Sequence, residues 1–184
     1  YGDVSTLSFH ATKLFHTIEG GACVVKDKTV SDKLELIKRF GHQGDTHYCL
    51  GINAKQDEFN AAMGLANFAH LDEIKAARKH ISELYDSLLN GKLRRPKAQD
   101  GLEYNYAYYP VVFESEKELL AAFDRLAKID VFPRRYFYPS LNKLPYLTAH
   151  YACPVSEDIA TRIACLPLYV GLSDANVEKI CGVL

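Results

Sequence analysis

The N-terminal part of the chain has two short apolar, β-branched runs on either side of a polar loop. The runs VSTLSF and ACVVKD each have the length of a strand, and the glycines of EGG are typical of a sharp reversal. The pattern predicts strands over residues 4–9 and 22–26, joined by a loop that carries Lys13. A short helix over residues 31–40 and the polar turn GHQGDTHY follow.

A long helical pattern occupies residues 57–89, and Gly64 within it predicts a close contact or a bend. Its apolar face comprises Ile74, Ala77, Ile81, Leu84, Tyr85 and Leu88. The composition then changes in the loop NGKLRRPKAQDG, which is rich in charge, glycine and proline. We therefore place a domain boundary near residues 90–103, between a first part with a long linking helix over residues 1–90 and a second domain over residues 91–184.

Strands and helices alternate in the second half of the chain, which predicts an α+β domain and, for the whole chain, the α/β class. The segments YNYAYYPVVF and VFPRRYF are expected to form strands. Ser115 and Glu118 form a capping box for a helix whose inward face is Leu119, Phe123, Leu126 and Ile129. Two further helices are predicted to begin at Ser156 and at Ser173 or Asp174.

Charge and composition exclude some functions. The chain has 184 residues, 48% of them hydrophobic, a formal net charge of −1 and a pI near 6.7. This balance gives no electrostatic reason to expect nucleic acid or an anionic membrane as a partner. No apolar run approaches the roughly 18 residues of a membrane span, and no signal peptide is visible.

The five cysteines are scattered, and the histidines show no metal-ligand spacing, so no metal site is predicted. Cys23, Cys165 and Cys181 each lie among apolar residues and are expected to be buried free thiols. Free thiols are typical of a reducing compartment, which here predicts the cytoplasm.

The loop SFHATKLFHTIEGG combines groups that suit a phosphorylated carbonyl compound. Most loop lysines are simply solvated. The apolar neighbours of Lys13 (Phe9, Leu14, Phe15 and Ile18) would favour the neutral, nucleophilic form of an amine by desolvation. Ser8, Thr12 and Thr17 supply hydroxyls, and Gly20–Gly21 would allow close approach of the backbone to a ligand.

The segments SFHATK, EGGA, GINAKQDEFNAAMGL and LPLY together resemble the C-terminal half of the DegT/DnrJ/EryC1/StrS sugar aminotransferases. These belong to the fold-type I enzymes that depend on pyridoxal 5'-phosphate. The resemblance runs through essentially the whole chain and implies the end of the large-domain sheet followed by a small α+β domain. It also implies a homodimer that transfers an amino group, usually from glutamate, to a nucleotide-linked keto-deoxysugar for lipopolysaccharide or another glycan.

The resemblance implies roles for individual residues. Lys13 matches the lysine that binds the cofactor covalently and then moves protons, and its presence separates the chain from the sugar dehydratase branch, which has histidine there. Ser8 matches the serine that binds the cofactor phosphate, and Asn53 the asparagine that reaches the phosphate of the neighbouring subunit. His10 is expected to line the site. Gln56 stands where the family often has methionine.

In the second domain, Arg134 and Tyr138 are the candidates for substrate binding, Arg134 through a carboxylate or diphosphate. Paired arginines beside a strand are more often surface features. The family's phosphate-binding turn, its pyridinium aspartate and its ring-stacking aromatic residue all precede the region that Tyr1 begins. The isolated chain is therefore expected to be inactive and to bind cofactor poorly.

Two other functions compete with the aminotransferase. The chain could be a non-catalytic dimerisation or sugar-nucleotide-binding module that retains the lysine by descent. Nucleic-acid binding through Tyr104–Tyr109 and the neighbouring basic loop is the weaker alternative, because stacking platforms need a positive groove beside them.

Overall fold

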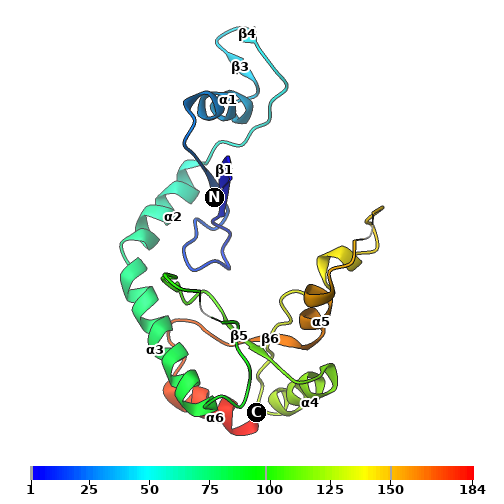
Figure 1. Ribbon diagram of the computed structural model, residues 1–184. Coiled ribbons are helices and arrows are strands. Elements are labelled where there is room, and N and C mark those ends of the chain that lie inside the picture. The colour runs from blue at the N-terminus through cyan, green and yellow to red at the C-terminus, as the bar shows by residue number, and fades with distance from the viewer. Residues whose placement is uncertain (1, 98, 150) are drawn as a thin grey trace. The chain divides into compact units, whose positions relative to one another are not determined.

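The chain divides into two compact units, Tyr1–Asp72 and Glu73–Leu184. The computed structural model describes residues 2–97, 99–149 and 151–184 (Figure 1). The division falls near the start of the helix α3 (Leu71–Leu89), upstream of the boundary that composition placed near residues 90–103. The reason is that Ile81, Tyr85 and Leu89 of this helix belong to the hydrophobic core of the second unit.

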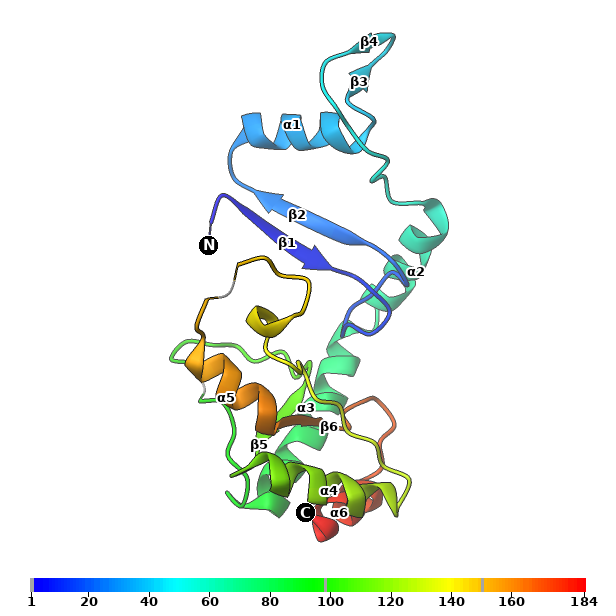
Figure 2. The same ribbon diagram turned by 90° about the vertical axis from the view of Figure 1, so that its right-hand side faces the viewer.

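The first unit begins with the antiparallel pair β1 (Val4–Ser8) and β2 (Gly21–Val25), as the sequence predicts (Figure 2). The register runs from Val4↔Val25 to Ser8↔Gly21. Its other elements are α1 (Lys28–Lys38), the hairpin β3 (His42–Gln43) and β4 (Thr46–His47), and α2 (Glu58–Phe68). Both strands of the pair are largely exposed.

Helix α1 begins earlier than the sequence predicts, because Asp27 caps it by accepting from the backbone N–H groups of Thr29 and Val30. The expectation of one continuous helix over residues 57–89 is wrong. Helix α2 ends at Phe68 and α3 begins at Leu71. Between them, the N–H of His70 donates to the carbonyl of Asn67, three residues back instead of four, which closes the last turn of α2 tightly.

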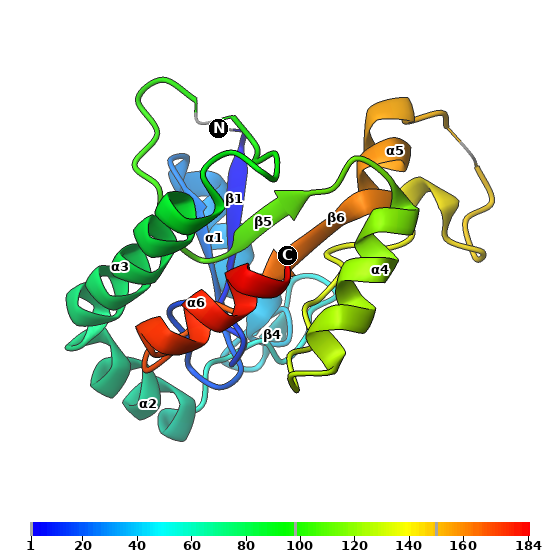
Figure 3. The same cartoon turned by 90° about the horizontal axis from the view of Figure 1, so that it is seen from below.

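The second unit is built on the antiparallel pair β5 (Tyr109–Val112) and β6 (Ile163–Leu166). Its other helices are α4 (Glu116–Ala127), the 3₁₀ turn Leu141–Lys143, α5 (Pro154–Arg162) and α6 (Asp174–Val183). Figure 3 shows α6 between α3 and α4, in front of the two strands. The α/β class is thus confirmed.

The helix starts largely follow the capping signals. Ser115 and Ser173 are the N-caps of α4 and α6, as predicted. The Glu118 carboxylate accepts from the N–H of Glu114 rather than from that of Ser115, so the capping box closes one residue early. Helix α5 begins at Pro154, ahead of the predicted Ser156, because proline is well suited to the first turn of a helix.

The segment VFPRRYF does not form the predicted strand. Its contact with the sheet is a single bridge between Arg134 and Cys165, in which the N–H of Cys165 donates to the Arg134 carbonyl at 2.8 Å. Its aromatic rings therefore do not alternate between buried and exposed positions as they would in a strand: Phe137 and Tyr138 are both exposed, and Tyr136 is half-buried.

The core of the second unit centres on the packed rings of Tyr85 and Tyr109, whose centroids lie 4.7 Å apart. The Tyr85 hydroxyl donates to the Pro167 carbonyl at 3.1 Å, and the Tyr109 hydroxyl to Asp86 at 2.7 Å. Burial raises the pKa of both tyrosines, most strongly through desolvation. Leu119 and Leu126 of α4 are fully buried, as the sequence predicts, and Phe123 and Ile129 pack at the edge of the core.

The burial of the cysteines differs between the two units. Cys181 is buried and Cys165 partly buried, but Cys23 is exposed, so the expectation for Cys23 is wrong. It lies on β2, whose faces have little else of the first unit to cover them. All five thiols are free.

No helix within the described ranges is both long and apolar enough to cross a membrane. The described residues also contain no group of three or more histidine, cysteine, aspartate or glutamate side chains placed to hold a metal ion.

Candidate active site

The loop between β1 and β2 carries Lys13, and its neck is closed by backbone hydrogen bonds. The N–H of Phe9 donates to the Gly20 carbonyl, and the N–H of Thr17 to the Phe9 carbonyl, both at 2.9 Å. Ser8 is the last residue of β1, where it pairs with Gly21. Sheet and loop together therefore hold Ser8 and Lys13 in one structural element.

His10 shapes the turn on which Lys13 lies. The N–H of Lys13 donates to the His10 carbonyl at 2.9 Å, and the N–H of Thr12 donates to His10 Nδ1 at 3.2 Å. Because Nδ1 accepts, the neutral ring carries its proton on Nε2, which lies 3.5 Å from the Glu19 carboxylate. His10 thus ties the turn to the far side of the loop.

The Lys13 side chain is exposed, so the expectation that apolar neighbours bury it is wrong within this chain. The ring of Phe15 packs edge-on against Phe9 at 5.1 Å between centroids, and against Phe68 of α2 at 6.0 Å. The apolar surfaces of these rings pack against one another and against α2. They do not cover the Lys13 amine, which therefore stays accessible.

The donor set fits a phosphorylated aldehyde. Among the described residues, neither the Lys13 amine nor the Ser8 hydroxyl has a hydrogen-bond or ion-pair partner. A free amine is what a covalent bond to a carbonyl carbon requires, and a free hydroxyl can donate to a phosphate oxygen. Both groups are therefore available to a ligand.

Helix α2 braces the loop from outside. The side-chain amide of Asn67 donates to the His16 carbonyl at 2.9 Å, and a Cβ atom at Gly64 would lie 2.7 Å from the Thr17 methyl carbon. The close contact predicted at Gly64 is thus confirmed. The sequence reasoning did not identify Asn67; an amide on the same helical face as Gly64 was the available signal.

Gly64→Ala is expected to destabilise the first unit by about 1–3 kcal/mol, because the added methyl group overlaps Thr17. Gly182→Ala is the matched control, since Gly182 also lies in a helix but has nothing within 4 Å of its Cβ position. That control should be neutral or stabilise by up to about 1 kcal/mol. Urea unfolding measures both, and equal effects of the two substitutions would contradict the contact.

The glycine pair at the neck serves the chain's own packing. A Cβ atom at Gly21 would lie 2.7 Å from the Leu7 carbonyl oxygen, and one at Gly20 would lie 2.2 Å from the Thr17 hydroxyl. The sequence predicts that Gly20–Gly21 let the backbone approach a ligand closely. In the described chain, these glycines instead allow close approach to Leu7 and Thr17.

Asn53 lies on a separate segment of the first unit. It is exposed and forms an isolated backbone bridge with Arg39, at the end of α1. No hydrogen bond between described residues joins Asn53 to Ser8 or Lys13.

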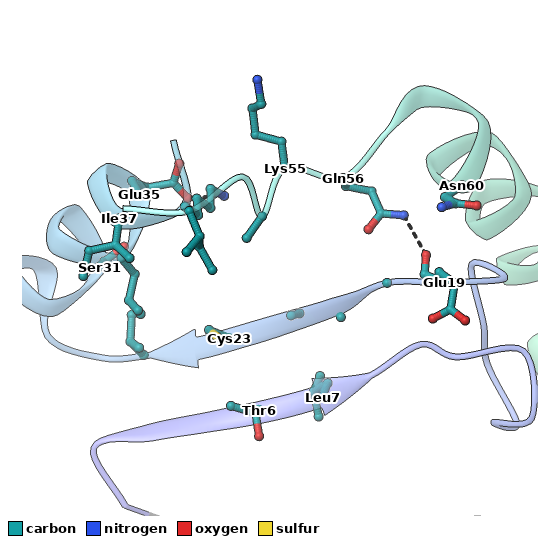
Figure 4. Close-up of a pocket in the computed structure, with 18 of the residues that line it drawn as sticks. Thr6, Leu7, Glu19, Cys23, Ser31, Glu35, Ile37, Lys55, Gln56 and Asn60 are labelled. Carbon is teal, nitrogen blue, oxygen red and sulfur yellow. Dashed lines mark hydrogen bonds and ion pairs between the residues drawn. The ribbon is translucent and has the colours of Figure 1, made fainter. Parts of the chain in front are cut away.

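A cavity of ≈ 800 Å³ opens between the β1–β2 pair, α1 and the segment that leads into α2 (Figure 4). Glu19, Gly20 and Gln56 line one end of it, and Ser31, Leu34 and Lys38 the other. Ser8, Lys13 and Asn53 are not among its lining residues. The candidate site therefore lies at the lysine loop, beside this cavity rather than in it.

In the second unit, Arg134 and its neighbour Arg135 differ in their contacts. Arg135 donates to Glu116 and to the Thr161 carbonyl, both at 2.6 Å, and its guanidinium carbon lies 3.5 Å from the centroid of Tyr138. Arg134 is exposed and donates to the Tyr136 hydroxyl at 3.0 Å. The Arg135 guanidinium is held by these contacts within the second unit, whereas the Arg134 guanidinium remains accessible to an anion.

The sequence pattern of the DegT/DnrJ/EryC1/StrS aminotransferase family matches residues 1–184. The chain belongs to this family. Members of the family depend on pyridoxal phosphate. The predicted family and cofactor class are thus confirmed.

Similar proteins include the dTDP-4-amino-4,6-dideoxy-D-glucose transaminase of Shigella dysenteriae, 34% identical over 100% of this chain and 52% of its own length. The GDP-perosamine synthase of Escherichia coli O157:H7 is 28% identical over 98% of this chain and 50% of its own length. The crystal structure of a DegT DnrJ EryC1 StrS aminotransferase from Brucella abortus matches with a TM-score of 0.89 and 26% identity, covering 100% of this chain and 50% of that one. This chain therefore spans about half the length of these relatives.

Proposed function

We propose that the polypeptide carrying this chain is a pyridoxal phosphate-dependent aminotransferase. It transfers an amino group from glutamate to a nucleotide-linked keto-deoxysugar, for lipopolysaccharide or another glycan. The observation that carries the proposal is the accessible Lys13 amine, held on a braced loop directly after Ser8, in a chain of this family.

The relatives support the substrate class. Their names describe transaminases or synthases of dTDP-linked and GDP-linked amino sugars, and this chain is alignable with them over nearly its full length. The free thiols fit a reducing compartment, which we propose is the cytoplasm.

When bound, the cofactor supplies an electron sink for the carbon that loses its proton. Lys13 would hold the cofactor through its amine; once the amino donor has taken its place in that bond, the freed amine would take and return the proton as a general base and acid. The Ser8 hydroxyl would donate a hydrogen bond to the phosphate and so hold the opposite end of the same molecule. In the second unit, Arg134 would offer a guanidinium to the anionic part of the substrate, and Tyr138 its exposed side chain.

Turnover tests the proposal. The polypeptide, loaded with pyridoxal phosphate, is mixed with glutamate and a dTDP-linked or GDP-linked 4-keto-6-deoxysugar, and 2-oxoglutarate formation is measured. We expect 2-oxoglutarate beyond one equivalent per bound cofactor only when the keto-sugar is present, because the amino group first passes to the cofactor itself. A cofactor-loaded protein that binds the sugar nucleotide without turnover would instead support the non-catalytic module.

Asn53→Ala is expected to weaken cofactor binding and to leave the proposed homodimer intact. The lost hydrogen bond would be to a charged phosphate, worth about 1.5–3 kcal/mol, or roughly tenfold to a hundredfold in affinity. Equilibrium dialysis measures the affinity, and light scattering measures the assembly. Asn176→Ala, which alters an exposed asparagine of the second unit, is the control and should change neither. Unchanged affinity in Asn53→Ala would argue against the role.

A further inference from the structure

Gln56 reaches the neck of the lysine loop from a segment far along the chain. It lies just before Asp57, the N-cap of α2. Its side-chain nitrogen Nε2 lies 3.2 Å from the Glu19 carbonyl oxygen, the contact drawn in Figure 4, and 3.4 Å from the Thr17 hydroxyl. Both partners belong to the end of the loop that returns to β2.

The contacts form a closed network of donors and acceptors. The Thr17 hydroxyl donates to the Glu19 carbonyl at 2.7 Å, so its lone pairs face an incoming donor. The two N–H groups of the Gln56 amide supply one hydrogen bond to Thr17 and one to Glu19. The Glu19 carbonyl then uses both of its lone pairs.

The absence of a side chain at Gly20 leaves space for the Gln56 amide. A Cβ atom at Gly20 would lie 2.7 Å from Gln56 Oε1 and 2.2 Å from the Thr17 hydroxyl. Any other residue at position 20 would push the amide or the hydroxyl away. The contacts of Gln56 at the neck therefore depend on glycine at position 20.

The network continues to Lys13. The N–H of Thr17 donates to the Phe9 carbonyl, next to His10, whose own carbonyl accepts from the N–H of Lys13. On the other side, the Glu19 carboxylate lies 3.5 Å from His10 Nε2. An amide that holds Thr17 and Glu19 thus holds both supports of the turn that carries the lysine.

We propose that Gln56 is a positioning residue for Lys13, acting through Thr17 and Glu19. The inference rests on the proposed function, in which Lys13 carries the cofactor. In this role, Gln56 fixes the direction in which the Lys13 side chain projects from the loop, and it contacts neither cofactor nor substrate itself.

Gln56→Met tests the proposal, because methionine has the same length but no donor. In the cofactor-free polypeptide, amide hydrogen exchange over residues 9–20 should be about tenfold faster in this variant, as expected for the loss of two neutral hydrogen bonds. Thr17→Val, which keeps a methyl group opposite Gly64, should have a similar effect. Each single variant keeps one hydrogen bond to the Glu19 carbonyl, from Thr17 or from Gln56. The double variant removes both, so exchange should be faster than in either single variant, but by less than the two effects combined, since the Gln56–Thr17 bond is lost in each.

Gln43→Met is the matched control: Gln43 lies exposed on β3, away from the loop. It should leave exchange over residues 9–20 unchanged. Exchange over residues 28–38, in α1 of the first unit, should be the same in all variants and excludes unfolding of that unit as a whole. Equal loop exchange in wild type and Gln56→Met would overturn the proposal.

The cofactor-loaded protein gives a second readout. Visible circular dichroism of the bound cofactor depends on a fixed, asymmetric orientation. We expect Gln56→Met to lower this signal at equal cofactor occupancy. An unchanged signal would overturn the positioning role. If borohydride reduction of the wild type leaves no cofactor on Lys13, the proposed function fails instead, and this outcome is recognised before any variant is compared.

Discussion

Lys13→Ala is expected to abolish the covalent cofactor adduct completely. In the wild type, borohydride reduction should fix the cofactor mass on the peptide that contains Lys13, as mass spectrometry would show. The physical reason is that this amine is accessible, lies on a braced turn and follows a free serine hydroxyl at the end of β1. Without this amine, no lysine remains on the loop between β1 and β2 to form the covalent bond.

Lys55→Ala is the control for this experiment. Lys55 is also an exposed lysine of the first unit, but it lies over the ring of Phe40, at 5.0 Å from its centroid, on a different segment. Its removal should leave the adduct on Lys13 intact. A cofactor mass on any other lysine of the wild type would overturn the assignment of Lys13.

Leu119→Ala is expected to have the largest effect on stability, with a loss of about 2–5 kcal/mol in the free energy of unfolding of the second unit. Leu119 is 0% exposed, and it lies on the face of α4 that packs into the core with Tyr85 and Tyr109. Truncation removes buried apolar contacts and leaves a cavity that the packed rings cannot fill. Urea unfolding followed by tyrosine circular dichroism measures the loss, because every tyrosine except Tyr1 and Tyr48 lies after residue 72.

The neighbouring Leu120 provides a control with the same chemistry. It lies on the same helix but is 47% exposed, so Leu120→Ala should change the free energy of unfolding by no more than about 0.5 kcal/mol. Similar losses for the two leucines would show that the buried face of α4 is assigned incorrectly.

Local patterns along the chain predict several strands and helix starts of this protein, and its motifs indicate the family. The apolar, β-branched runs and the EGG reversal were enough to predict β1 and β2, and the serines at 115 and 173 to predict two helix starts. These features depend on residues close to one another along the chain. The candidate residues Ser8 and Lys13 were found in the same way, from a short motif whose spacing is set by one strand and one loop.

The side chains that support this motif come from distant parts of the chain and are brought to it by tertiary packing. Gln56 and Asn67 brace the loop across separations of 37 and 51 residues, and no local pattern records such contacts. The exposure of Cys23 and the anchoring of Arg135 between α4 and α5 likewise depend on which segments pack beside them. Periodicity describes which face of an element is apolar, but the partner of that face is chosen by packing among segments distant in the sequence.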